Sequence, residues 1–354
     1  MESLNDEWAA FMSNDGEYEN SKKKNINSTF KPECTSLYIS TQTKIGFLDK
    51  TIPLEEIFWK LPMIQYHEAK EGIIKKIIKI NSETKEEVED LEKHISQQSN
   101  INVDIISKVD NVSGNVKKFK DIRKIIIGFS KKDLINFRKK KKSAFYNCFA
   151  VIVRIFHEGA FKEVNIKLFN TGKLEIPGIQ KIETLHISVD ILTNIINSIS
   201  NLNVKHVKDK IETVLINSNF SCNYYINRTV LYNILKFEYD IHSLYDPCSY
   251  PGIQCKFFYN KENNTHDGTC HCKKKCNLNK KNKENVCRVV SFMVFRTGSI
   301  LIVGNCDEHI LNIVYKFVVD ILSNEVDKIR ANDSVVTRVK KEKKYRKRIV
   351  LFTK

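Results

Sequence analysis

Four cysteines, grouped late in the chain, have the residue type and the close spacing of metal ligands. They lie within the segment TCHCKKKCNLNKKNKENVC as Cys270, Cys272, Cys276 and Cys287. Four thiolates can hold a structural Zn²⁺ tetrahedrally. The spacing Cys-x-Cys-x₃-Cys-x₁₀-Cys lacks paired Cys-x-x-Cys knuckles, so a lysine-rich loop with free thiols is the alternative. No secretory signal is recognised, and a disulfide framework is therefore not expected. No cofactor is predicted to be required, and zinc in this segment would be structural.

Residue patterns for catalysis are missing from the sequence. It contains no phosphate-binding glycine loop, no His-Glu-x-x-His and no nucleophile elbow. The chain is therefore predicted not to be an enzyme, and neither catalytic residues nor a small-molecule substrate are expected. Its apolar runs fall far short of the ~20 residues that span a bilayer, so no membrane partner is expected.

The charge of the chain favours a polyanionic partner. Lys and Arg number 58 against 42 Asp and Glu, which gives a net charge of +16 at pH 7. A strongly basic chain without a membrane segment is typical of proteins that bind nucleic acid. The alternative is that part of the charge reflects composition alone, because AT-rich codons favour Lys, Ile and Asn.

One ten-residue phrase occurs twice. FNTGKLEIPG begins at Phe169 and FRTGSILIVG begins at Phe295, and both read Phe-x-Thr-Gly-x-(Leu/Ile)-x-Ile-x-Gly. Three residues that end in Gly predict a tight hairpin loop, with Gly172 at positive φ. An apolar stripe at helical spacing predicts a helix over 182–199 after the first copy. After the second copy, Asp307 is a candidate N-cap for a helix to about residue 326.

The repeated phenylalanine lies off the core face of its strand. Val164, Ile166 and Leu168 alternate along the strand before the first turn and share one apolar face, which places Phe169 on the other. The same parity holds for Phe295. An aromatic side chain on an open sheet face can act as a wedge between base steps of a minor groove. The alternative is that it packs against a neighbouring strand.

Composition and the strand and helix patterns divide the chain into an N-terminal arm, two similar units with one insertion each, and a C-terminal tail. Between about 81 and 143 the strand pattern is interrupted by a charged helix and a loop-like stretch from 100 to about 116. The predicted segments are a disordered acidic arm (1–34), a first unit (35–202, with the 81–143 insertion), a second unit (203–326, with a Cys-rich insertion at about 261–287) and a basic tail (327–354).

These features together resemble the TATA-box-binding protein family. The two hairpins LFNTGKLEIPG and VFRTGSILIVG are similar to the hairpin of that family, and SLYDPCSYPGI and FAVIVRI resemble two of its other motifs. The resemblance implies an α+β fold: a duplicated saddle, with a curved antiparallel sheet and long helices on its convex face. It implies a transcription initiation factor that binds double-stranded DNA in the minor groove, kinks it with Phe wedges and recruits RNA polymerase and a B-type initiation factor. Long insertions and the Ile/Asn/Lys bias are most similar to homologues from large cytoplasmic DNA viruses.

The resemblance also assigns DNA-binding residues by position. Phe169 and Phe295 correspond to wedges, Tyr250 to the partner of the second wedge, and either Cys148 or Phe149 to the partner of the first. The remaining DNA contacts that it implies are Arg154, Lys167, Thr171, Lys173, Lys256, Arg296, Thr297, Leu301 and Val303. Where the family has a base-contacting Thr, this chain has Pro177 and Val303, and Glu175 replaces an apolar residue. We therefore expect an altered base preference.

Two other functions stay open at this point. One is a non-enzymatic adaptor that keeps the saddle but binds protein partners with weak DNA affinity or none. The other is an enzyme on the same duplicated fold, against which the missing acidic cluster argues. The expected location is intracellular: the nucleus, or the host cytoplasm or virion for a viral protein.

Overall fold

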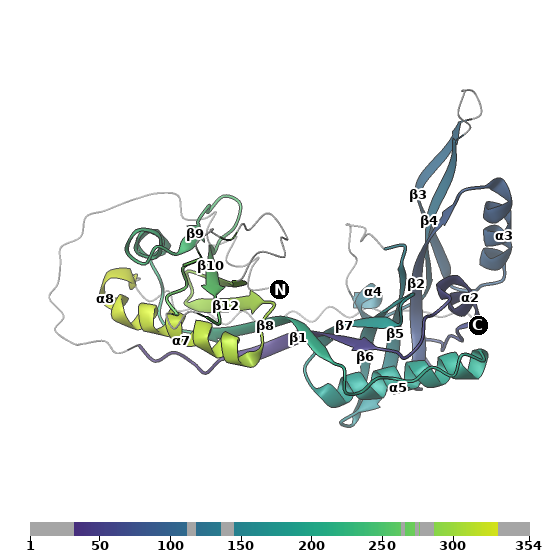
Figure 1. Cartoon of the computed structure of the whole chain (residues 1–354), viewed down its shortest axis with the longest axis horizontal. Coiled ribbons are helices and arrows are strands. Elements are labelled where there is room, and N and C mark those ends of the chain that lie inside the picture. Colours follow the sequence, from purple (N-terminus) through teal and green to yellow (C-terminus); the bar gives the residue numbers. More distant parts are fainter. Residues whose placement is uncertain are drawn as a thin grey trace. The chain divides into compact units, whose positions relative to one another are not determined.

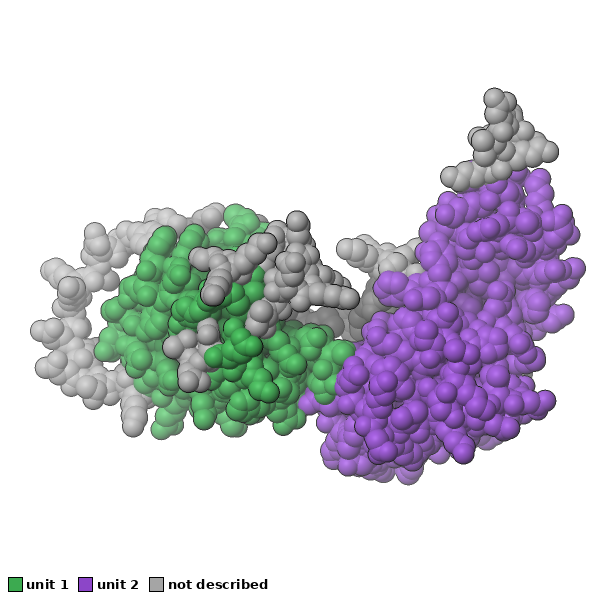
Figure 2. All heavy atoms as spheres, viewed as in Figure 1, with its two compact units in different colours: residues 1–41, 213–341 green, residues 42–212, 342–354 purple. Residues whose placement is uncertain are grey.

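The computed structural model describes residues 32–111, 118–135, 145–262, 266–272, 276 and 287–331 (Figure 1). The chain forms two compact units: residues 1–41 with 213–341, called unit 1, and residues 42–212 with 342–354, called unit 2 (Figure 2). Nearly all of the predicted acidic arm and basic tail lie outside the described residues, as does the basic run Arg138–Lys142.

Unit 2 is built on an antiparallel sheet with the strand order β3-β4-β2-β5-β6-β7-β1. Consecutive strands β5, β6 and β7 are neighbours, so short hairpins connect them. The strands are β1 (Tyr38–Phe47), β2 (Gly72–Ser82), β3 (Ile101–Asn111), β4 (Lys118–Gly128), β5 (Cys148–His157), β6 (Ala160–Phe169) and β7 (Lys173–Ile179).

The helices of unit 2 are α2 (Leu54–Lys60), α3 (Lys85–Ser96), α4 (Lys131–Ile135) and α5 (Ile182–Ile199). The predicted helix over 182–199 is confirmed as α5. Its buried stripe includes Leu185, Val189 and Leu192, which pack in one cluster with Ile166 and Leu168 of β6. The strand parity predicted from the sequence therefore holds in this unit, and α5 covers the apolar face of the sheet.

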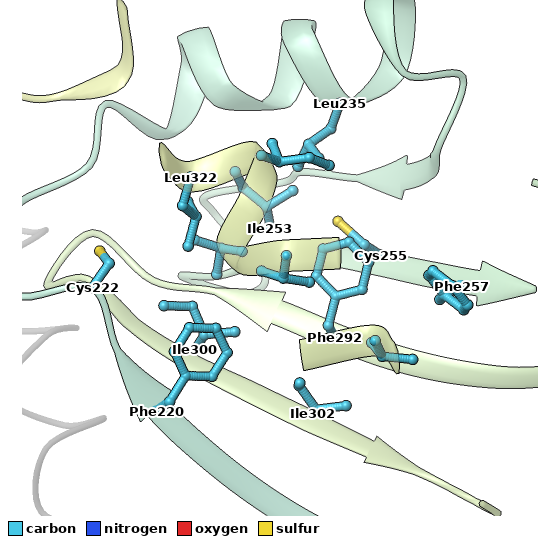
Figure 3. Close-up of a cluster of buried hydrophobic side chains, with 14 of the residues drawn as sticks. Phe220, Cys222, Leu235, Ile253, Cys255, Phe257, Phe292, Ile300, Ile302 and Leu322 are labelled. Atoms are coloured by element: carbon cyan, nitrogen blue, oxygen red, sulfur yellow. The ribbon is translucent and has the colours of Figure 1, made fainter. Parts of the chain in front are cut away.

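Unit 1 has an antiparallel sheet with the strand order β8-β12-β11-β10-β9. Its elements are β8 (Glu212–Ser221), α6 (Arg228–Asn233), the π-helix η1 (Ile234–Glu238), β9 (His242–Leu244), β10 (Ile253–Tyr259), β11 (Arg288–Val294), β12 (Ser299–Gly304), α7 (Glu308–Asn324) and α8 (Val326–Ile329). Figure 3 shows Phe220, Ile300 and Ile302 in its core, which α7 closes with residues such as Leu322. The Asp307 side chain accepts a hydrogen bond from the Ile310 amide at 2.9 Å, so the predicted N-cap is confirmed.

The predicted α+β class with an antiparallel sheet is confirmed, but the prediction for the 81–143 insertion was partly wrong. The charged helix exists as α3, whereas the stretch predicted to be a loop is strand β3, which pairs with β4 and extends the sheet beyond β2. Because β3 lies at the sheet edge, its apolar residues Ile105, Ile106 and Val109 are exposed, and a bulge near Ile105 breaks its alternation. An edge strand without a buried face gives no clear apolar pattern.

The two repeated turns have the same conformation and the same docking contacts. Gly172 and Gly298 have φ of +79° and +77°, which confirms the positive φ predicted for Gly172. In unit 2 the carbonyl oxygen of Gly172 accepts from the Leu48 amide at 2.8 Å, and that of Asn170 accepts from Ile52 at 2.8 Å. Each turn is therefore held to the segment that follows the first strand of its unit.

In unit 1 the corresponding bonds recur. The Gly298 carbonyl accepts from the Cys222 amide at 2.9 Å, and the Arg296 carbonyl accepts from Ile226 at 2.8 Å. The repeated phrase therefore encodes a docked turn in both units and not only a hairpin.

A buried lysine supports the end of helix α2. Lys76 of β2 is only 1% exposed, and its Nζ donates to the carbonyl oxygens of Phe58 at 2.8 Å and Leu61 at 2.9 Å. These carbonyls lie at the C-terminal end of α2, where helical partners are missing. Burial lowers the pKa of Lys76 to about 8. Lys76 is thus a buried side chain whose amine donates hydrogen bonds to carbonyl oxygens at the helix end, where no helical amide can.

Replacing Lys76 with Met is expected to lower the free energy of unfolding by about 1–3 kcal/mol, because buried carbonyls lose their donor. Urea unfolding followed by circular dichroism measures this. Lys60→Met is the matched control, since Lys60 lies at the same helix end but pairs with Glu56 on the surface. Equal stability of the two variants would contradict the capping role.

Candidate nucleic-acid interface

One face of the unit 1 sheet carries partly exposed side chains in two rows that cross four strands. We call it the unit 1 open face. Strand parity places these side chains opposite the buried ones, such as Ile216, Phe220 and Phe292. The cross-strand register aligns Lys256, Ser291, Val303 and Asn217 in one row, and Gln254, Met293, Leu301 and Asn219 in the other.

Polar groups on this face are hydrogen-bonded to one another. Lys256 Nζ donates to Ser291 Oγ at 2.7 Å. Asn217 Nδ2 donates to Thr41 Oγ1 at 3.3 Å, and Asn219 Nδ2 donates to the hydroxyl of Ser40 at 2.9 Å. The face therefore combines amide and hydroxyl groups with the apolar side chains of β11 and β12. Such a mixture can contact both the acceptors and the sugar walls of a minor groove.

Sequence reasoning missed Asn217 and Asn219. The signal that could have found them is their alternation with Ile216, Ser218 and Phe220, which places both amides on the face opposite the core. Asn is frequent along the whole chain, so two more asparagines did not stand out in the sequence.

Tyr250 and Phe295 form an aromatic pair at the end of the unit 1 open face. Their ring centroids are 5.9 Å apart with an interplanar angle of 59°, and the Tyr250 hydroxyl donates to Met293 Sδ at 3.6 Å. Gly252 also lies against the Phe295 ring, where a Cβ would come within 3.0 Å. Phe295 is therefore only 4% exposed, and of the two readings the structure supports packing on a neighbour. Strand parity could not reveal this, because the cover comes from a loop distant in sequence.

The corresponding position of unit 2 is more open. Phe169 is half-buried, Lys173 Nζ lies 5.8 Å from its ring centroid, and Cys148 is its cross-strand partner. Phe149 points the other way: it is fully buried in the core and packs edge-on against Phe58 at 5.9 Å. Adjacent strand residues face opposite sides, so of the two alternatives for the partner of the first wedge, Cys148 lies across from Phe169 and Phe149 lies in the core. That either of them contacts DNA stays a prediction.

Two of the predicted basic contacts are engaged within the protein. Arg154 is 7% exposed, and its guanidinium donates to the carbonyl oxygens of Glu68 at 2.6 Å and Tyr66 at 2.9 Å. Its guanidinium is thus engaged by the 62–71 loop, and its role as a phosphate contact stays a prediction. Lys167 of β6 forms an ion pair of 2.6 Å with Glu175, its cross-strand partner on β7.

The other predicted site residues lie at the turns and on the open faces. Thr171 is exposed in the first turn, and Arg296 and Thr297 are partly exposed in the second. Leu301 and Val303 lie on the unit 1 open face, while Pro177 lies on β7 two residues beyond Glu175. That these residues contact DNA stays a prediction.

The four cysteines of the sequence analysis come together. Their Sγ atoms all lie within 4.8 Å of one another, and those of Cys272 and Cys287 are 3.5 Å apart. The cluster could hold a metal ion. Within the described part of the chain, no helix is long and apolar enough to cross a membrane.

Comparison with known proteins supports the resemblance found in the sequence. No family model matches the chain. A curated protein of Acanthamoeba polyphaga mimivirus, named TATA-box-binding protein-like, is 27% identical over 207 residues, which are 54% of this chain and 52% of that protein. The match thus spans about half the length of this relative. A solved structure of Methanococcus jannaschii TBP aligns with 82% of this chain and 99% of its own at 12% identity, with a TM-score of 0.38. The predicted resemblance to TATA-box-binding proteins is confirmed by the mimivirus relative.

Proposed function

We propose that the chain is a TATA-box-binding-protein-like transcription initiation factor that binds duplex DNA in the minor groove and kinks it with phenylalanine wedges. The observation that carries the proposal is the repeated turn, which has one Phe at its start and the same two docking hydrogen bonds in both units. The name of the mimivirus relative points to the same function. The factor has no enzymatic activity in this proposal.

The two units are proposed to be copies of one saddle repeat. In the sheet of each unit, the first strand of the unit lies beside the second strand of the hairpin that carries the repeated turn. The first strand of that hairpin comes next, and then the strand before it in the chain. The two orders are β1-β7-β6-β5 and β8-β12-β11-β10. In both, a long helix follows the repeated phrase and packs on the buried face, α5 in one and α7 in the other. The open faces would meet DNA, and the exposed sides of α5 and α7 would remain free for RNA polymerase and a B-type initiation factor.

The unit 1 open face fits a minor groove better than a major groove. Val303 and Leu301 present a smooth apolar surface across β12, and Asn217 and Asn219 flank it. Minor-groove edges of A·T pairs offer only acceptors, which amide Nδ2 groups can approach. Because Val303 stands where the family has Thr, base reading on this side would rely on the asparagines.

A non-enzymatic adaptor is the second candidate, and particular contacts favour it. Lys167 is neutralised by Glu175, Arg154 is buried, and Phe295 is covered by Tyr250. An open face whose cations are engaged within the protein has less to offer phosphates than the net charge of the chain suggests. The adaptor would bind polymerase or other factors and have weak or no affinity for DNA.

A DNA titration that compares wild type with Glu175→Gln tests the proposal. Removing the carboxylate frees Lys167, so the logarithmic salt dependence of binding should steepen by about one, and affinity at ~0.15 M salt should rise about five-fold. Fluorescence anisotropy of an AT-rich duplex at several salt concentrations measures both.

Glu158→Gln is the control, because Glu158 also pairs with lysines, Lys162 and Lys181, but at the β5–β6 turn. It should leave affinity and slope nearly unchanged. If wild type shows no salt-dependent binding, the DNA-binding proposal is refuted and the adaptor is supported.

A further inference from the structure

We propose that Cys270, Cys272, Cys276 and Cys287 bind one Zn²⁺ and that this ion closes the hairpin between β10 and β11. The site is structural, and it rests on the geometry of the cysteine cluster and not on the proposed DNA binding. Four protein ligands leave no open position for a substrate or a water, so the ion holds the chain and performs no chemistry.

The sulfur positions match a tetrahedral ion. Cys272 Sγ lies 3.5 Å from Cys287 Sγ and 3.9 Å from Cys276 Sγ, and Cys287 Sγ lies 3.9 Å from Cys270 Sγ. Four sulfurs at ~2.3 Å from a central zinc are about 3.8 Å apart when the angles are tetrahedral. All pairs stay within 4.8 Å, so an ion can enter with little movement. The separations are far longer than a disulfide bond of ~2.05 Å, and all four cysteines are free.

Neighbouring groups support sulfur as the complete ligand set. The Cys276 amide donates to Cys270 Sγ at 3.4 Å, and backbone donors of this kind are common around metal thiolates. The two histidines of the insertion are otherwise occupied: His271 Nε2 lies 2.7 Å from Asp267 Oδ2, and His266 stacks on Tyr259 at 5.6 Å. A set of four thiolates selects zinc or iron among the common ions. The expected ion is zinc, which tetrahedral structural sites take most often.

The position of the cluster explains what the ion would do. In unit 2 the equivalent hairpin β5–β6 closes after the pair His157–Ala160 with a two-residue turn, Glu158 and Gly159, both at positive φ. In unit 1 the last pair of β10–β11 is Tyr259–Arg288, and residues 260–287 intervene. Closing a long loop costs conformational entropy that a tight turn avoids, and ligation can supply the compensating free energy.

The described part of the insertion returns to the sheet just before the ligands begin. The Phe258 amide donates to the Gly268 carbonyl at 3.0 Å, and Gly268 has φ of +81°. A Cβ at Gly268 would come within 2.9 Å of Ile241 and Phe257, so the backbone lies directly on the core. Cys270 follows two residues later, and Cys287 directly precedes β11. A bound ion would therefore join the end of this docked segment to the residue directly before the next strand.

The test uses the full-length chain, purified under reducing conditions without chelator, and its metal content is measured by mass spectrometry. We expect about one zinc per chain. Replacement by Co²⁺ should give the visible bands of tetrahedral cobalt together with thiolate-to-metal charge transfer. Cys276→Ser should lose most of the metal, whereas Cys248→Ser, an exposed cysteine outside the cluster, should keep it.

A second measurement guards against misfolding of the variant. Chelating zinc from wild-type protein should increase hydrogen exchange at the amides of Phe258 and of residues 266–272, while the amides of β12 and α7 stay protected. Metal-free wild-type protein that gives no cobalt spectrum would overturn the proposal, as would iron in place of zinc or a metal content that Cys276→Ser leaves unchanged. None of these readouts depends on DNA, so failure of the proposed function would leave the zinc result standing.

Discussion

Phe169→Ala combined with Phe295→Ala is expected to abolish the bending of an AT-rich duplex and to weaken binding by at least about ten-fold. Wedges that enter between base steps unstack them and bend the duplex, and the bend brings more protein surface into contact. An aromatic ring stacked against a base contributes about 1–3 kcal/mol, as judged by alanine substitution. Energy transfer between dyes at the two ends of the duplex measures the bend, and anisotropy measures the affinity.

The two phenylalanines differ in burial, and the experiment has to allow for that. Phe295 is 4% exposed against Tyr250, so alanine leaves a cavity that costs about 3–5 kcal/mol in a well-packed site. Phe169 is half-buried, and Phe169→Ala alone should reduce bending without this loss of stability. Phe237→Ala is the control, because Phe237 is 73% exposed on η1 and outside the repeated phrase. A folded double variant that bends DNA as wild type does would refute the wedge mechanism.

The burial of Phe295 adds a step to the proposed mechanism. Before it can enter DNA, the ring has to leave Tyr250 and the backbone at Gly252. In the free protein this contact shields a large apolar side chain from water, which disfavours association through an exposed aromatic patch. Phe169 is half-buried, with Cys148 across the strand and Lys173 Nζ 5.8 Å from its ring centroid, so it is expected to need less release than Phe295. The two halves of the proposed kink are thus expected to differ in their energetic cost.

Periodicity and turn chemistry allowed the central parts of both units to be predicted. α5 and α7 follow from apolar stripes and an Asp cap, and the faces of β6 and β7 follow from alternation. Local rules suffice there because each element has one buried side. The pairing of β3 with β4 was not predicted, since Ile105, Ile106 and Val109 are exposed at a sheet edge and form no buried stripe.

Three of the predicted site residues are buried, and the burial has one physical origin. Arg154, Phe149 and Phe295 were assigned to DNA contacts by sequence position or strand parity. The surroundings of each side chain are set by a segment distant in the chain. Arg154 donates hydrogen bonds to the carbonyl oxygens of Tyr66 and Glu68. Phe58 packs against Phe149, and Tyr250 packs against Phe295. Alternation along one strand indicates which face a residue occupies, but not what lies over that face. The Cys cluster could be predicted because all four ligands lie within one short stretch.

Gly172→Ala is expected to cost about 3 kcal/mol of unfolding free energy, although the change adds a single methyl group. Part of the cost is conformational, because Gly172 has φ of +79°, where a Cβ is strained by about 1–2 kcal/mol. The rest is steric, since the new Cβ would overlap the carbonyl oxygen of Lys50 and lie 3.1 Å from that of Leu48. The turn would have to move away, and the docking bond from the Leu48 amide to the Gly172 carbonyl would weaken.

Gly178→Ala separates these two contributions. Gly178 ends the same repeated phrase and has φ of +85°, but a Cβ there would meet nothing within 4 Å. Its cost should therefore be the conformational part alone, about 1–2 kcal/mol. Both variants lie in unit 2, so urea unfolding of the same unit reports both, and Gly298→Ala should reproduce the larger loss in unit 1, where the added Cβ would overlap the Tyr224 carbonyl. If Gly172→Ala and Gly178→Ala were equally destabilising, the docked turn would not be what the repeated Thr-Gly preserves, and the observation that carries the proposed function would lose its structural basis.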